Sequence, residues 1–129
     1  MSQLFGHLSR EFLRDIGTKS RDVFELMLPP ADVFEDGSDL VIMLDMPGFE
    51  KDRIKTRLTE SMLAITAKRD PVERDGITYW EQRPLRISKK IVLPLRVDTS
   101  DDLETKAKYI DGILTIRLPI KGVGKIRVE

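Results

Sequence analysis

Few residues in this chain are of the types that carry chemistry. His7 is the only histidine, and there is no cysteine. No acidic or cysteine cluster accompanies His7 at the spacing of metal ligands, and a Ser-His-Asp arrangement needs a histidine that the rest of the chain lacks. We therefore expect no metal site and no nucleophilic catalysis.

The acidic clusters are typical of turns. Asp98, Asp101 and Asp102 belong to one polar turn, and solvated turn residues are a better interpretation than a catalytic carboxylate pair. The stretch from Asp36 to Asp39 lacks the spacing of a calcium loop. There is no glycine-rich phosphate loop and no dinucleotide fingerprint. We expect a protein that is not an enzyme and that needs no cofactor.

The aromatic residues of segment 69–84 indicate binding. The segment is charged, is interrupted by prolines, and holds Tyr79 and the only tryptophan, Trp80. A loop of this length inside a compact domain is usually functional or disordered. Residues 77–81 have the composition of a strand, and an exposed tryptophan favours a partner surface.

The N-terminal residues 1–27 have apolar side chains at helical spacing. Gly17 is the expected end of this helix, and a second apolar group follows at 23–28. Two interpretations stay open: a helix docked on the domain's own core, or an arm that binds other subunits or foreign chains. The residues of the apolar stripe are Leu4, Phe5, Leu8, Phe12, Leu13 and Ile16.

Composition narrows the class of protein. The 129 residues suffice for about one domain, and 22 basic residues balance 22 acidic ones. A neutral net charge argues against a binder of nucleic acid, whose affinity rests on excess basic charge. No apolar run approaches the roughly 20 residues of a membrane span, and no secretory leader is visible. We expect a cytoplasmic protein without a membrane span.

Beyond Pro29-Pro30 the pattern is that of β-structure. Asp111-Gly112 is a hairpin turn, because glycine adopts positive φ without steric cost. Short alternating segments with turn signals predict an all-β sandwich or barrel. We expect an N-terminal arm at 1–30, a β-domain at 31–119 and a C-terminal extension at 120–129. The expected strands are 33–35, 40–46, 52–58, 63–67, 85–93, 103–109 and 114–118.

Lys89 lies in phase with the apolar residues of the strand expected at 85–93. A lysine on a buried face needs a partner or a subunit boundary. A bend or bulge that frees the ammonium is the alternative interpretation.

Several motifs, each weak alone, occur together in an order that resembles the α-crystallin domain of small heat-shock proteins, of the short prokaryotic or archaeal kind. The resemblance covers about residues 32–128. The motifs are Asp45-Met46-Pro47-Gly48-Phe49, Leu63-Ala64-Ile65, Ile91-Val92-Leu93-Pro94, Gly112-Ile113-Leu114 with Leu118-Pro119, and Ile126-Arg127-Val128.

The resemblance implies an immunoglobulin-like β-sandwich with a helical N-terminal arm and a flexible C-terminal tail. It implies dimers in which Ile77–Glu81 of one copy pairs with Val33–Glu35 of another. Many family members carry arginine where this chain has Lys89, and lysine cannot form arginine's planar fork. The residues assigned to this exchange are Val33, Phe34, Tyr79, Trp80 and Lys89.

The resemblance also gives the tail a role. Ile126 and Val128 point the same way in a strand, so both can enter one groove on a neighbouring copy. A frayed terminal strand of the same domain is the alternative. Burial of two such side chains contributes roughly 3–6 kcal/mol before the ordering cost, so each tail is a weak clip that gains avidity in a large oligomer. The expected groove residues are Ile54, Leu58, Leu103 and Ala107.

Two functions remain open. The first is an ATP-independent holdase chaperone, a large homo-oligomer whose apolar stripe binds partly unfolded proteins and prevents their aggregation. The second is a monomeric or dimeric adaptor or co-chaperone that binds one folded partner. Native mass separates them.

Overall fold

The computed structural model describes residues 9–101 and 106–122. The helix α2 spans Arg10–Met27 and begins at Ser9, whose hydroxyl accepts a hydrogen bond from the Phe12 amide at 3.1 Å. The helix does not end at Gly17 as we expected from the sequence. It continues for ten further residues, because Gly17 is a packing position and not a cap, and it stops just before Pro29-Pro30.

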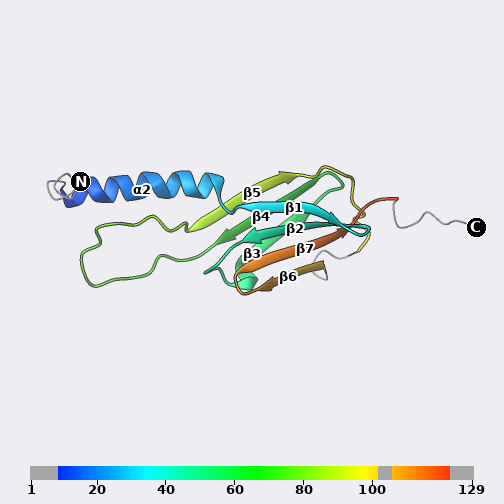
Figure 1. The fold of residues 1–129 in the computed structure, drawn as a ribbon. Helices are drawn as coiled ribbons and strands as arrows, with labels where there is room; N and C mark the ends of the chain where they lie inside the picture. Colours follow the sequence, from blue (N-terminus) through cyan, green and yellow to red (C-terminus); the bar gives the residue numbers. More distant parts are fainter. Residues whose placement is uncertain (1–8, 102–105, 123–129) are drawn as a thin grey trace, which may run out of the picture.

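Within the described residues, seven strands form two antiparallel sheets, which confirms the expected all-β sandwich with an N-terminal helix. The larger sheet has the order β1-β2-β7-β6 and the smaller sheet the order β3-β4-β5 (Figure 1). The 3-10 turn η1, at Lys51–Arg53, leads into β3. The strands are β1 at Ala31–Asp36, β2 at Asp39–Asp45, β3 at Ile54–Leu58, β4 at Met62–Lys68, β5 at Arg86–Val92, β6 at Ala107–Ile110 and β7 at Ile113–Pro119.

The core lies between the two sheets and is formed by every second side chain of the strands. In β4, Leu63 and Ile65 are fully buried, because alternate side chains of a strand point to the same face. β2 lies between β1 and β7 and is buried on both faces over part of its length, as its apolar run predicts. The other core residues include Leu40, Ile42, Leu44, Met46, Ile87, Val97, Leu114, Ile116 and Leu118.

The hairpin between β6 and β7 has the predicted turn. Asp111 and Gly112 both have positive φ, at 54° and 78°. A Cβ on Gly112 would lie 3.0 Å from the Pro47 Cα, and the Gly112 carbonyl accepts from the Met46 amide at 2.7 Å. Glycine is therefore required here by conformation and by close approach, and the hairpin packs on the turn at Pro47-Gly48.

Two expected strands begin later than predicted. The strand expected at 52–58 begins at Ile54, because residues 51–53 form η1. The strand expected at 103–109 begins only at Ala107 within the described residues, since Lys106 is in a 3-10 turn. Leu103 lies outside the described residues. The Tyr109 hydroxyl donates to the Phe49 carbonyl oxygen at 2.9 Å, which joins this short strand to the turn after β2.

Candidate functional site

The loop from 69 to 85 contains no helix or strand. It projects from the same end of the sandwich as α2, and the two run beside one another (Figure 1). The side chains of Ile77, Tyr79 and Trp80 are exposed, and the Trp80 indole nitrogen donates to the Gln82 side chain at 3.5 Å. The strand pairing expected for residues 77–81 therefore stays a prediction about two copies of the chain.

Gly17 is the one buried residue among those of α2. A Cβ at this position would lie 2.9 Å from both the main-chain nitrogen and the main-chain oxygen of Glu81. Real Cβ atoms do not approach backbone so closely, so the helix and the loop can touch here only because residue 17 has no side chain. This contact explains why a glycine stands in the middle of a helix that it would otherwise weaken by about 1 kcal/mol.

Two charged residues one and two turns beyond Gly17 hold the same loop. Arg21 lies 3.6 Å from a Glu81 carboxylate oxygen, and the Arg21 side chain is mostly buried. The Glu25 carboxylate accepts from the amides of Leu85 and Arg86 at 2.7 and 2.8 Å. These amides open β5, and a carboxylate that accepts both fixes where the loop ends and the strand begins.

This polar face of the helix was not predicted from the sequence. Gly17, Arg21 and Glu25 are spaced four residues apart and therefore lie on one side of α2. That spacing is the only local signal of this face. One glycine and two charged residues are a weaker indication of a buried contact than an apolar stripe is. The contacts with Glu81 and Leu85 are distant in sequence and leave no local pattern.

The predicted apolar stripe of the arm is divided by these contacts. Phe12 is 49% exposed, whereas Leu13 and Ile16 are half-buried on the side of Gly17. Leu4, Phe5 and Leu8 lie outside the described residues. Further apolar side chains of the same helix are exposed, namely Val23, Phe24, Leu26 and Met27.

The acceptor strand expected at Val33–Glu35 lies in β1, an edge strand of the larger sheet. Val33 and Phe34 are both exposed, although successive residues of a strand point to opposite faces of the sheet. An edge with uncovered apolar residues on both faces is open to a further strand.

Lys89 lies in β5, whose pairing with β4 runs without interruption from Arg86 to Val92. The side chain is half-buried in phase with Ile87 and Ile91, and its ammonium donates to the Met27 carbonyl at 3.4 Å. No bulge frees the ammonium. It reaches the last residue of α2 instead, and a role at a subunit boundary remains a prediction.

The expected groove residues lie on two edge strands of different sheets. Ile54 and Leu58 are on β3, Ala107 is on β6, and all three are partly buried against the core. Leu103 and the tail residues Ile126 and Val128 lie outside the described residues. A groove between these two edges stays a prediction.

Among the described residues there is no group of three or more histidine, cysteine, aspartate or glutamate residues that could hold a metal ion. The described part of the chain also contains no helix with the length and apolar character needed to cross a membrane.

The structures of several similar proteins have been solved. A structure of the Del-C4 mutant of hsp14.1 from Sulfolobus solfatataricus P2 is 42% identical, with a TM-score of 0.72 over 79% of this chain and 83% of that one. The A102D mutant of the same protein is 40% identical, with a TM-score of 0.74 over 88% and 91%. Heat shock protein 16.0 from Schizosaccharomyces pombe, 21% identical with a TM-score of 0.62 over 78% and 94%, shares the fold.

Among curated relatives, an 18 kDa heat shock protein from Streptomyces albus G is 32% identical over 126 residues, which is 95% of this chain and 82% of the relative. The model of the Hsp20/alpha crystallin family matches residues 32–128, from β1 to the end of the tail. With a sandwich of the same fold and a match over most of its length, the chain belongs to the Hsp20/alpha crystallin family.

Proposed function

We propose that this protein is an ATP-independent holdase that binds partly unfolded proteins and acts as a large homo-oligomer of strand-exchanged dimers. Its family consists of small heat-shock chaperones, which supports a chaperone role. The observation that carries the proposal is the exposed apolar surface of α2 and the loop. It includes Phe12, Leu26, which is 82% exposed, and Trp80.

A surface of this kind suits clients without a common sequence. Apolar side chains on a helix and a loop can repack against different partners, whereas a rigid pocket selects one. Binding to non-native chains lowers the concentration of the species that aggregate and needs no external energy. We place the client-binding surface on the apolar stripe of the arm, from Leu4 to Ile16.

The test is light scattering from a substrate that aggregates on heating. Leu4→Ser, Phe5→Ser and Phe12→Ser are introduced together, and we expect the suppression of scattering to fall several-fold. A matched variant carries Arg10→Ser, Arg14→Ser and Thr18→Ser on the other side of the same helix, where the described residues are exposed. Equal suppression by both variants would remove the arm from the proposal.

The dimer is proposed to form when residues 77–81 of one copy pair with β1 of another. The uncovered edge of β1 and the exposed Tyr79 and Trp80 support this exchange, because one pairing event covers both.

The absence of cysteine from the sequence makes the exchange easy to test by cross-linking. A Val33→Cys variant is mixed with a Tyr79→Cys variant, and oxidation should give a mixed disulfide that peptide mass spectrometry identifies. Lys55→Cys on β3, an edge strand of the other sheet, replaces Val33→Cys in the control. A mixed disulfide at the same yield in the control contradicts the exchange.

The tail is proposed to join dimers through Ile126 and Val128, with Ile54, Leu58, Leu103 and Ala107 of a neighbour as the groove. Ile126→Ser with Val128→Ser should reduce the native mass, measured by size-exclusion chromatography with light scattering, to that of a dimer. Lys125→Ser with Arg127→Ser changes the same tail and should leave the oligomer intact. A wild-type protein that is itself a monomer or dimer would favour the adaptor function instead.

A further inference from the structure

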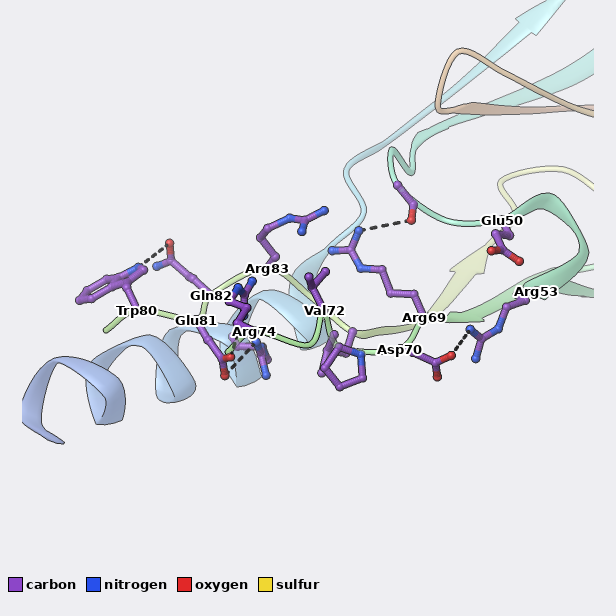
Figure 2. Close-up of a pocket in the computed structure, with 14 residues that line it drawn as sticks. Glu50, Arg53, Arg69, Asp70, Val72, Arg74, Trp80, Glu81, Gln82 and Arg83 are labelled. Carbon is purple, nitrogen blue, oxygen red and sulfur yellow. Dashed lines mark hydrogen bonds and ion pairs between the residues drawn. The ribbon is translucent and has the colours of Figure 1, made fainter. Parts of the chain in front are cut away.

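A cavity of about 510 Å³ lies where the loop leaves the sandwich, between α2 and the turn after β2 (Figure 2). This volume is within the range of small-molecule sites, roughly 300–1,000 Å³. Arginine dominates its wall, together with three acidic residues and the apolar side chains of Val72, Trp80 and Leu85. The arginines are Arg21, Arg53, Arg69, Arg74 and Arg83.

The acidic residues do not balance these cations. Glu81 pairs with Arg74 at 3.1 Å and with Arg21 at 3.6 Å. Asp70 pairs with Arg53 at 3.4 Å. With Glu50 counted as the third acid, five arginines against three carboxylates leave a formal charge of +2 in the wall of the cavity.

Arg69 is held rigidly. Its Nε donates to the Pro84 carbonyl at 2.7 Å, one terminal nitrogen donates to the Gly48 carbonyl at 3.5 Å, and its guanidinium carbon lies 4.7 Å from the centre of the Phe49 ring. Burial and the nearby charges of Arg83 and Arg21 lower the pKa of Arg69, and they outweigh the opposite effect of the Glu25 carboxylate. A guanidinium fixed in this way presents its remaining N–H groups in one direction at little entropic cost.

The Arg83 guanidinium lies near that of Arg69, and no carboxylate within the described residues forms an ion pair with it. A Cβ built on Gly48 would lie 2.5 Å from a terminal nitrogen of Arg69 and 3.6 Å from a terminal nitrogen of Arg83. Within the described ranges, Arg83 makes no hydrogen bond or ion pair. Two guanidinium groups therefore converge over Gly48 and repel one another.

Arg21 adds a second, independent sign of an absent acceptor. Its Nε is buried and has no hydrogen-bond partner among the residues that the structure describes. A buried donor without an acceptor destabilises the fold, and such groups are rare in native proteins.

We propose that this cavity binds a small phosphate monoester, with its dianionic phosphate between Arg69 and Arg83 and its organic part against Val72 and Leu85. A dianion matches the excess charge of two, and the fork geometry of arginine suits phosphate oxygens. Val72 and Leu85 line the cavity from the two ends of the loop, outside the residues 77–81 that are proposed to pair with another copy.

Binding can be followed by tryptophan fluorescence, because Trp80 lines the cavity and is the only tryptophan of the chain. Phenyl phosphate and inorganic phosphate are titrated into the full-length protein at constant ionic strength, followed by tryptophan fluorescence and by calorimetry. We expect saturable binding of both, with phenyl phosphate the tighter, and no saturable binding of phenol. Constant ionic strength is needed because added salt screens every exposed charge.

Arg83→Gln should weaken phosphate binding by about tenfold or more, since a hydrogen bond to a charged group is worth at least one factor of ten. Arg83→Lys keeps the charge but not the fork and should fall between Arg83→Gln and the wild type. Arg83 is exposed, so we expect both variants to fold. Arg96→Gln removes one positive charge from a side chain beyond the far end of β5 and is the matched control.

Comparison of the Arg83 and Arg96 variants with the wild type distinguishes a specific site from general attraction by charge. A loss of affinity in Arg83→Gln together with wild-type affinity in Arg96→Gln supports the site. Equal weakening by both variants means that phosphate interacts with the general charge of the protein, and this overturns the proposal. Linear, unsaturable responses by both fluorescence and calorimetry in the wild type overturn it as well.

Discussion

The sandwich core and the contact between α2 and the loop hold their parts together by different means. In the core, alternating apolar side chains of two sheets fill one space, and residues such as Ile42 and Ile65 are fully buried. The helix meets the loop through a glycine, an arginine and a glutamate. Apolar burial is non-directional and tolerant, whereas the contact of α2 requires a few atoms in fixed places.

The difference has a functional meaning. A region stabilised by a few polar contacts opens at lower cost than a packed core, so the proposed exchange of partners by the arm and the loop would leave the sandwich folded. The exposed apolar residues also concentrate there, on Phe12, Val23, Phe24, Leu26, Met27, Val72, Ile77, Tyr79 and Trp80.

The largest effect is expected in the core. Ile65→Ala deletes a fully buried side chain and should lower the free energy of unfolding by about 2–5 kcal/mol, because a cavity remains. Val92→Ala, at a position 74% exposed in the neighbouring strand, should change it by about 0.5 kcal/mol or less. Denaturant unfolding at one fixed protein concentration measures both. Similar losses would mean that the sandwich is not the stable unit.

The second largest effect is expected on amide hydrogen exchange where α2 contacts the loop. Gly17→Ala should favour an isolated helix by about 1 kcal/mol, yet it places a Cβ 2.9 Å from Glu81 backbone atoms. We expect α2 and residues 77–81 to exchange amide hydrogen faster, while the main thermal transition stays in place. Gly76→Ala, where a Cβ would meet nothing within 4 Å, is the control. Slower exchange in Gly17→Ala would show that propensity outweighs the contact.

A smaller and more local effect is expected at the carboxylate that opens β5. Glu25→Ala leaves the amides of Leu85 and Arg86 without their acceptor, and their hydrogen exchange should accelerate by about tenfold. Asp22→Ala removes an exposed acid from the same helix and should leave both amides unchanged. Acceleration throughout β5 would indicate that Glu25 stabilises the whole strand and not only its start.

The smallest expected effect is on how the stability of the fold depends on pH. The Lys121 ammonium, 2.7 Å from a Glu60 carboxylate oxygen, lowers the pKa of Glu60 below its ordinary value of 4.5. A lowered folded-state pKa stabilises the fold above the unfolded value, and the contribution disappears as pH falls through the folded value. The stability difference between wild type and Glu60→Gln should therefore be present near neutral pH and vanish in acid. Lys121→Gln removes the other partner of this pair and should give a difference with the same pH dependence.

Local patterns predicted much of the fold. The alternation in residues 40–46 and 63–67 predicted β2 and β4, and Asp111-Gly112 predicted the hairpin turn, in which the glycine has the expected positive φ. The prolines at 29 and 30 predicted the break between helix and sheet. Each of these signals lies within a few residues of the structure that it specifies, so it can be read without knowing what is nearby in space.

The candidate site could be predicted only in part. The sequence indicated Tyr79, Trp80 and the apolar arm as binding residues, and these assignments remain predictions. It gave no indication of Glu25 or of the arginine cavity, whose members come from α2, from the turn at Gly48 and η1, and from both ends of the loop. Residues so far apart in the chain have no common period.

The amino-acid sequence by itself determined the strands, the turns and the family, because periodicity and turn chemistry are local. Only the tertiary structure decided what Gly17 does. As a local signal, glycine marks the end of a helix, but here the backbone of Glu81 occupies the space that a side chain would need. The cost of glycine within a helix is local, whereas the benefit of close approach depends on a segment more than sixty residues away.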